Sequence, residues 1–374
     1  PFASDGHHRS HDWIGKLNLE YTLRPDHALN LNLYGTGTWQ QPHNELMDRS
    51  LGYPANFDSR LTALTTGLSY EAFFFDRRLQ TAVTAKHFLI GSRAQMLHNF
   101  YLRDIKTIHI NRSEWGANFA ACYRITPLWT VKGSVASEVR IPTSEELLGN
   151  SFNILPSPDL LPERNKSVNA GVLYRRPFSD DRVWEAEFNV YMSELTDMVR
   201  FTPDLLPTMA RYTNFGQVRT MGIEAEIKAD VTRWCYLYAN GTWQDLRDRR
   251  RTFPNSKAPN PTYDLRIPNI PYLMANFGGE LHWADLFGRG QNTRLLLDAS
   301  YVHRYSYDFE MGAYLEKLIP TSLTFDAAIE QSFANRRWTL TLKVKNLADR
   351  ETVSEFNRPL PGRTCSVKLR YLLR

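Results

Sequence analysis

The chain has 374 residues, 42% of them hydrophobic, and a formal net charge of +5 at pH 7. No stretch of about 18 apolar residues occurs, which excludes a membrane protein built from helices. Its 45 Lys and Arg residues are scattered along the sequence rather than gathered on one helix or stripe, so we do not expect nucleic-acid binding. Length alone allows one large β-domain or two or three smaller ones.

Apolar and polar residues alternate through most of the chain, which is typical of β-strands. Residues 1–12 are predicted as part of a loop, followed by strands at 13–23 and 28–39 that a tight turn joins. The clearest alternation lies near the C-terminus. There Trp338, Leu340 and Leu342 share one face of a strand whose other face carries Thr and Lys.

The predicted connections alternate between short turns and long loops. Short or moderate turns are predicted at 24–27, 76–78, 126–128, 178–182, 232–233, 283–292 and 334–337. Long connections are predicted at 40–59, in a segment reaching residue 113, and at 142–164, 202–211, 247–269, 308–320 and 347–361. This rhythm gives about 15 strands in up-and-down order, as in outer-membrane barrels with short periplasmic turns and long extracellular loops.

We therefore predict an all-β, antiparallel, up-and-down transmembrane β-barrel. A β-sandwich is the alternative, but its strands have about 5 or 6 residues and its loops do not alternate in length. Single-chain bacterial barrels have an even number of strands and begin on the periplasmic side. An odd count of about 15 predicts that further strands precede this chain.

Tryptophans lie near many predicted strand ends, where barrels carry aromatic girdles at the lipid interfaces. The alternative is a large β-protein that simply uses many aromatic residues. These tryptophans are Trp13, Trp39, Trp115, Trp129, Trp184, Trp234, Trp243, Trp283 and Trp338.

Metal and catalytic chemistry have weak support in the sequence. Cys122, Cys235 and Cys365 are odd in number and lack metal-ligand spacing, so we expect neither disulfides nor a zinc site. His7, His8 and His11 are candidate metal or haem ligands, but His-rich surface segments are usually solvated. Glu145 and Glu146, if on a strand, point to opposite faces and form no acid/base pair. No nucleophile elbow or zinc-protease motif occurs, so we expect no enzyme and no cofactor.

Three segments, taken in order, carry a resemblance to one known protein family. The run 140–149, then 157–163 and a strand at 165–174, is similar to the family's Arg-x-Pro, Glu-Leu and Asn-Pro-x-Leu-x-Pro-Glu pattern, with Ser157 in place of the usual Asn. Residues 212–216 and 219–226 are similar to its Asn, Gly-x-Glu strand. Residues 344–349 and 361–364 are similar to its C-terminal signature, although the chain ends on Arg374 rather than an aromatic residue.

The family that these segments resemble is the TonB-dependent outer-membrane receptors. The resemblance implies a 22-stranded barrel with an N-terminal plug. Residues 1–374 then form a single C-terminal portion of the barrel, and the plug and first strands are missing upstream. The implied function is uptake of a siderophore–iron complex, haem or a vitamin across the outer membrane. The implied partners are the TonB complex, through the missing plug segment, and outer-membrane lipid and lipopolysaccharide. This portion alone is not expected to transport. An adhesin or surface-protein anchor is the alternative, and an outer-membrane hydrolase lacks a convincing nucleophile and base.

Two sets of candidate site residues follow. By alternation, inward-facing charges are expected to line the lumen, where water or a plug solvates them; these are Glu224, Glu226, Lys228, Asp326 and Glu330. Aromatic and Arg residues where strands meet outer loops suit bulky anionic ligands, with girdle or loop packing as the alternative; these are Arg140, Tyr212, Trp243, Arg247, Tyr305 and Tyr307. The run 247–251 is either an anion contact or a solvated loop tip. Gly222 indicates a bulge or a close backbone approach.

Overall fold

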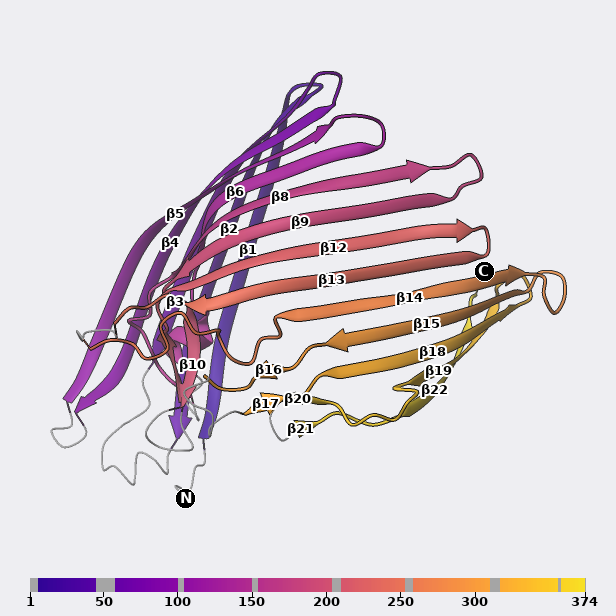
Figure 1. The fold of residues 1–374 in the computed structure, drawn as a ribbon. Coiled ribbons are helices and arrows are strands. Elements are labelled where there is room, and N and C mark those ends of the chain that lie inside the picture. Colours follow the sequence, from indigo (N-terminus) through magenta and orange to yellow (C-terminus); the bar gives the residue numbers. More distant parts are fainter. Residues whose placement is uncertain are drawn as a thin grey trace. The chain divides into compact units, whose positions relative to one another are not determined.

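The computed structural model describes residues 6–44, 58–99, 104–149, 154–203, 210–252, 258–309, 317–355 and 358–373. Its main element is a 15-stranded sheet in which each strand pairs with the next along the chain (Figure 1). The strands are β1 (Gly6–Arg24), β2 (His27–Asn44), β3 (Ser59–Phe74), β4 (Leu79–Asn99), β5 (Asp104–Arg124), β6 (Trp129–Arg140), β8 (Glu163–Pro177), β9 (Val183–Thr196), β12 (Val218–Thr232), β13 (Cys235–Asp248), β14 (Leu273–Ala284), β15 (Asn292–Val302), β18 (Ser322–Phe333), β19 (Trp338–Lys345) and β22 (Thr364–Tyr371).

The long connections carry short elements of their own. A three-stranded sheet contains β7 (Ile154–Leu155), β10 (Val199–Pro203) and β11 (Ala210–Asn214). Two further pairs are β16 (Tyr305–Ser306) with β17 (Leu318–Ile319), and β20 (Val353–Glu355) with β21 (Arg358–Pro359). One short helix, α2 (Ser144–Leu148), follows β6. No helix within the described ranges is long and apolar enough to cross a membrane.

The chain divides into two compact units. The first contains residues 1–122, 134–168 and 193–218, and the second contains residues 123–133, 169–192 and 219–374. The contacts described below each lie within one unit.

The predicted alternation is confirmed, and one face of the sheet is apolar without a protein layer over it. Leu297, Ile329 and Leu342 remain 49%, 51% and 46% exposed on three adjacent strands, β15, β18 and β19. Antiparallel register pairs Leu297 with Ala327 and Ile329 with Leu342, so the apolar side chains meet across strands. A β-sandwich would bury these side chains beneath a second sheet. The sheet therefore has the exposed apolar face that a lipid-facing wall requires.

Two predicted loops are wrong over residues 6–12, 91–99 and 104–113. Residues 1–12 were expected in a loop, but β1 already begins at Gly6, which pairs with Asn44. The segment reaching residue 113 was expected to be a long connection, but β4 and β5 extend to Asn99 and from Asp104. In both places the sequence is polar and lacks the alternating pattern of a strand. A strand still forms there, because backbone pairing satisfies N–H and C=O groups whatever the side chains are. Residues 45–57, 204–209 and 310–316, within the predicted connections 40–59, 202–211 and 308–320, lie outside the described residues, as does the side chain of His8.

Candidate functional site

In the first unit, the connection between β6 and β8 folds onto the polar face of β3 and β4. We call residues 141–162, with the small sheet of β7, β10 and β11, the loop cap. Leu147, Leu148 and Leu160 of the loop cap are buried in one cluster with Leu61, Ile90 and Ala94. Leu61 and Ile90 lie on the face that also carries polar residues such as Lys86. Contact with the cap explains why this part of the polar face has apolar side chains.

Helix α2 starts the loop cap with a capping box. The hydroxyl of Thr143 accepts a hydrogen bond from the Glu146 amide at 3.3 Å, and Glu146 Oε2 accepts one from the Thr143 amide at 2.7 Å. Glu145 and Glu146 were considered above as strand residues, and this is wrong because both lie in the first helical turn. Carboxylates are favourable there because helix N-termini have unpaired N–H groups.

Arg140, a predicted ligand residue, joins the loop cap to the ends of β6 and β8. Its Nε and Nη2 donate to the two carboxylate oxygens of Glu163 at 2.7 and 2.8 Å, and its Nη1 donates to Glu146 at 2.9 Å. Glu163 also accepts a hydrogen bond from the Val199 amide of β10 at 2.7 Å. Fork-like pairs of this kind fix geometry as well as charge. In this structure Arg140 therefore holds β6, β8, α2 and β10 together.

Tyr212 and Asn214 hold β11 against the rest of the cap. Tyr212 packs on the apolar cluster, and its ring lies edge-on to Phe201 at 5.2 Å. Burial raises the pKa of Tyr212, and the neighbouring Glu145 and Glu146 raise it further. Asn214 accepts a hydrogen bond from the Leu161 amide at 2.9 Å and donates to the Leu161 carbonyl at 3.0 Å. Residues 212–216 form one of the motifs described above, but nothing in the sequence indicated that Asn214 binds the Leu161 backbone.

The arginine run 247–251 in the second unit is largely paired with acids. Arg247 donates to Asp245 at 2.6 Å, Arg249 to Asp264 at 2.6 Å, and Arg250 to Asp248 at 2.7 Å. The pair between Arg249 and Asp264 ties the end of β13 to the segment that returns toward β14. The geometry supports a structural role for most of this run.

Asp248 is the centre of that network, and its side chain is 0% exposed. It accepts hydrogen bonds from Thr262 Oγ1 at 2.6 Å, Asn260 Nδ2 at 3.0 Å and the Arg250 guanidinium and amide. A buried carboxylate needs this many donors because its charge is otherwise unsolvated. Nothing in the sequence distinguished Asp248 from the neighbouring acids Asp245 and Asp264.

Trp243, Tyr305 and Tyr307 lie in different local structures. Trp243 pairs with Leu273 and lies on the same face of β13 as the exposed Leu237 and Ala239. This is the apolar face of the sheet. The hydroxyl of Tyr305 donates to the Ser354 carbonyl at 3.2 Å. Tyr307 is 37% exposed, and its amide donates to the Lys317 carbonyl at 2.7 Å. The ligand role of all six residues stays a prediction.

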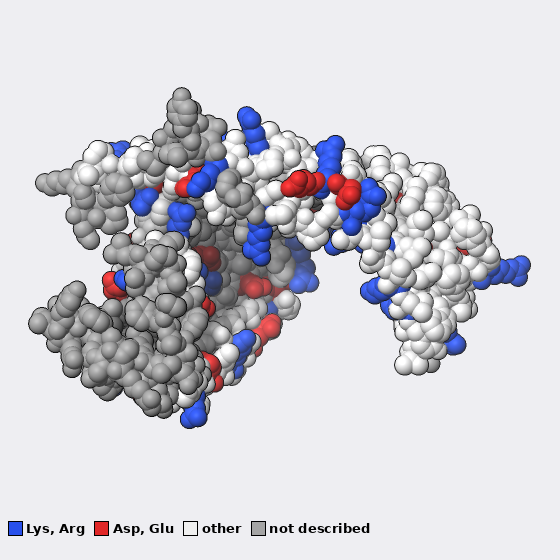
Figure 2. All heavy atoms as spheres, turned by 90° about the horizontal axis from the view of Figure 1, so that it is seen from below, with Lys and Arg blue, Asp and Glu red and all other residues white. Residues whose placement is uncertain are grey.

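The predicted lumen residues lie among ion pairs on the polar face of the second unit. Lys228 contacts Glu226 at 2.7 Å, and Arg294 contacts Glu330 at 3.5 Å as well as Glu280. Asp326 lies 3.9 Å from Lys343, and Glu224 follows the same alternation as Glu226. On the molecular face shown in Figure 2, acidic and basic side chains are interspersed. Their contact with a lumen or plug stays a prediction.

His7 and His11 lie on β1 with exposed side chains. Over the described ranges, no group of three or more His, Cys, Asp or Glu residues is arranged to hold a metal ion. The histidine cluster therefore gains no support as a metal site from the part of the chain that the structure describes.

Comparison with known proteins gives one family and many similar structures. The family described as "TonB dependent receptor-like, beta-barrel" matches residues 7–347. The siderophore receptor PiuA from Acinetobacter baumannii superposes with a TM-score of 0.70 at 13% identity, over 98% of this chain and 56% of that one. The copper transporter OprC gives 0.75 at 14% identity, over 97% and 56%. The Serratia marcescens hemophore receptor HasR, solved with hemophore HasA and heme, gives 0.66 at 14% identity, over 98% and 59%. A comparison with curated protein sequences gives no match.

Proposed function

Because the chain belongs to the TonB-dependent receptor β-barrel family, we propose that it is the barrel portion of an uptake receptor powered by TonB. Members of this family are outer-membrane transport proteins rather than enzymes. The chain spans little more than half the length of the similar structures. The nutrient, the plug and the coupling to TonB are therefore parts of the proposal, with the plug supplied by the complete protein.

The loop cap is the observation that carries this proposal. In barrels of this kind the long connections are extracellular, so the cap lies at the outer end of the wall. It folds onto the polar, inward face through Leu147, Leu148 and Leu160, and Arg140 fixes it there. A receptor needs a preorganised surface at its entrance, because a disordered loop pays an entropic cost on binding. An anchor that only presents a surface protein has no need of an inward-folded cap.

We propose a bulky nutrient as the ligand: a siderophore–iron complex, haem or a vitamin. Among the six candidate contacts, the structure favours Tyr307, whose ring is partly exposed in a long connection. Arg140 and Arg247 are engaged by carboxylates, and Trp243 lies on the apolar face. An aromatic ring at this position offers stacking to a planar or aromatic ligand.

Uptake by the complete protein tests the proposal. The gene is expressed in an iron-starved host that lacks its own receptors, with and without tonB, and uptake of labelled ferric siderophores, haem and cobalamin is measured. We expect uptake of one of these nutrients that requires tonB, and weaker ligand binding in Tyr307→Ala. Tyr174→Ala, whose ring packs against Trp129 away from the long connections, is the control. Uptake that is the same without tonB contradicts the proposal. Cell adhesion without uptake of any nutrient favours the adhesin alternative.

A further inference from the structure

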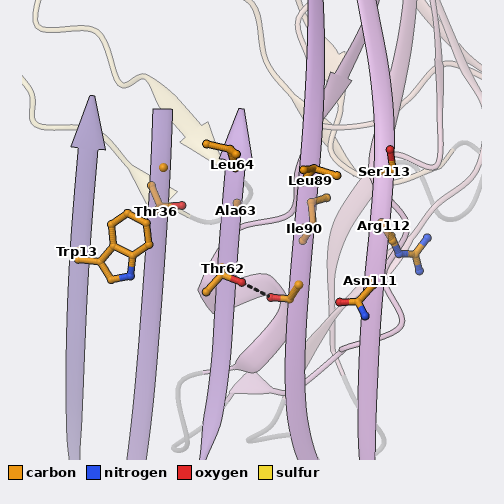
Figure 3. Close-up of a pocket in the computed structure, with 12 residues that line it drawn as sticks. Trp13, Thr36, Thr62, Ala63, Leu64, Leu89, Ile90, Asn111, Arg112 and Ser113 are labelled. Carbon is orange, nitrogen blue, oxygen red and sulfur yellow. Dashed lines mark hydrogen bonds between the residues drawn. The ribbon is translucent and has the colours of Figure 1, made fainter. Parts of the chain in front are cut away.

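The side chain of Arg112 in β5 reaches beneath the loop cap. Its Nη2 donates a hydrogen bond to the backbone carbonyl of Asp159 at 3.3 Å. Figure 3 shows Arg112 and its neighbour Asn111 pointing to opposite sides of β5. Asn111 lines a groove with Leu64 and Leu89 on the apolar face, so Arg112 lies on the polar, inward face. Within the described ranges, Arg112 makes no ion pair with a carboxylate.

The acceptor that Arg112 holds is weak. Its hydrogen bond to a neutral carbonyl is 3.3 Å long, whereas a guanidinium bonded to a carboxylate has a distance of about 2.7–2.9 Å. Glu114, two residues along the same face of β5, is 12% exposed and pairs with Arg164 instead. A carboxylate from a ligand would therefore bind Arg112 more strongly than the Asp159 carbonyl does.

A second buried donor, the Ser92 hydroxyl, lies beside Arg112. Ser92 is 6% exposed and pairs with Leu61, which packs against the loop cap. An added Cβ at Gly91 would lie 3.4 Å from Asn111 Oδ1 on the neighbouring strand. Ser92 and Arg112, the next residue of each strand, are therefore diagonal neighbours on the inward face, about 7–8 Å apart and within reach of a long side chain. Ser92 Oγ and Arg112 Nε are both buried, and neither has a hydrogen-bond partner among the described residues.

Arg112 lies outward of the lipid-facing band. Trp115, three residues further along β5 and 66% exposed, is an aromatic residue of the kind found at lipid interfaces. Three residues extend roughly 10 Å along a strand. Arg112 lies on the side of Trp115 that leads to the β4–β5 connection, at the opposite end of β4 from its short turn to β3. A nutrient that enters from outside therefore reaches Arg112 before the membrane-spanning part of the wall.

One carboxylate matches the two donors. Buried polar groups are normally hydrogen bonded, and leaving a donor unpaired is costly. One carboxylate oxygen can accept from the Arg112 guanidinium and the other from the Ser92 hydroxyl, while its charge neutralises the arginine. A neutral amide or ester oxygen would serve one donor and leave the charge of Arg112 in place.

We propose, on the basis of the uptake function proposed above, that Arg112 and Ser92 recognise a free carboxylate of the nutrient. The carboxylate replaces the Asp159 carbonyl at Arg112, and the cap segment around Asp159 moves aside to admit it. The two residues thereby select carboxylate-bearing nutrients over neutral ones. Arg140 does not have this role, because Glu146 and Glu163 already pair with it.

Two pairs of probes test this assignment. Haem and haem dimethyl ester share a ring and a metal, but the ester has no free carboxylate. Ferric citrate and ferrioxamine B form the second pair, with and without free carboxylates. Binding of each probe to the complete purified protein in detergent is measured by quenching of tryptophan fluorescence. We expect the wild type to prefer the carboxylate-bearing member of one pair. R112Q should weaken that binding by roughly tenfold and S92A by roughly threefold, and neither should change binding of the counterpart.

Lys106→Gln is the matched control, because Lys106 is exposed on the same face of β5 and the variant loses the same charge. Equal weakening in K106Q and R112Q overturns the proposal, since long-range charge would explain both. Equal weakening of both members of a pair in R112Q, with cap cleavage as fast as in Arg140→Lys, also overturns it, because Arg112 would then be only an anchor of the cap. R112K, checked for heat-modifiable gel mobility, keeps the charge without the fork and replaces R112Q if that variant fails to fold.

The binding measurement is independent of TonB, so it separates this site from the proposed function. A wild type that prefers the free carboxylate in neither pair overturns the site, even where uptake depends on tonB. Uptake that is independent of tonB contradicts the proposed function, even where binding depends on Arg112.

Discussion

Tyr191 of β9 lies with its phenol ring directly over Gly222 of the neighbouring strand β12, in the space that a Cβ at position 222 would occupy. Gly222 is buried by this contact. The sequence predicted a bulge or a close backbone approach at Gly222, and the structure shows a close approach by a side chain from the next strand. Covering a strand glycine with an aromatic ring protects the backbone and fixes the register of the pair.

Gly222→Val should destabilise the barrel, because the new side chain must displace the Tyr191 ring. We expect a cost of about 1–3 kcal/mol, as for other overpacked sites. Gly241→Val on β13 is the matched control, since an added Cβ there would meet its nearest atom at 3.6 Å. Urea unfolding in detergent measures both. Tyr191→Ala should relieve part of the cost in the double variant, and a purely additive result would contradict the contact.

Arg140→Lys should loosen the loop cap without unfolding the barrel. Lysine cannot make the two-oxygen contact with Glu163, so two side chains that are 13% and 12% exposed, Glu163 and Glu146, lose partners. We expect roughly a tenfold faster proteolytic cleavage within residues 141–162, equivalent to about 1.4 kcal/mol. Arg175→Lys, whose exposed pair with Glu185 is 3.7 Å long, should leave cleavage unchanged. Unchanged cleavage in Arg140→Lys would remove the structural role assigned to Arg140.

Asp248→Asn should open the arginine-rich connection that follows β13. The amide cannot accept all of the hydrogen bonds that reach the buried carboxylate, and Arg250 loses its counter-charge. Breaking a buried pair costs about 3–5 kcal/mol. Trypsin should then cut after Arg249, Arg250 or Arg251 in the variant, whereas the wild type resists. Glu351→Gln, at an exposed acid, serves as the control, and a trypsin-resistant Asp248→Asn would show that the network is dispensable.

The alternation of side chains was sufficient to predict the main sheet, because a period of two depends only on which face meets lipid. Trp338 and Leu342 show this directly, since both lie on the exposed apolar face as expected. The strand residues 6–12, 91–99 and 104–113 were not predicted, because this pattern is missing there. There the strands extend beyond the apolar band, both faces carry polar residues, and the pattern vanishes while the backbone pairing continues.

The site was harder to predict, because its side chains act through partners distant in sequence. Arg140 is a candidate anion contact when its own segment is considered alone. In the structure it donates to Glu163, which also accepts a hydrogen bond from the Val199 amide. The same holds for Arg247, whose partner Asp264 lies in a returning segment. Basic and aromatic residues near strand ends are easily found in a sequence. Whether carboxylates already pair with the basic residues depends on how the long connections fold.

Alkaline pH should release the loop cap through Tyr212. Burial, together with Glu145 and Glu146, raises the pKa of Tyr212 in the folded cap, so the folded form favours the neutral phenol. The stabilisation is complete below the ordinary tyrosine pKa of about 10 and is lost as pH rises above it. Between pH 9 and 11, wild-type cap cleavage by subtilisin should accelerate more than cleavage of Tyr212→Phe. Parallel pH profiles for the two proteins would show that another group controls the cap.

Ala239 and Asn240 are adjacent in β13 but face opposite sides of the sheet, and they offer a direct test of which side meets lipid. Ala239 pairs with the exposed Phe277 on the apolar face, whereas Asn240 accepts a hydrogen bond from Asn276 at 3.1 Å on the polar face. Ala239→Arg should cost about 2–4 kcal/mol near the bilayer midplane, whereas a charge on the inward face meets water or protein dipoles. Asn240→Arg should therefore cost much less, although the backbone position is nearly the same. Urea titration of both variants folded into lipid vesicles measures the difference, and equal costs would contradict the assignment of the two faces, including the placement of Trp243 on the lipid side.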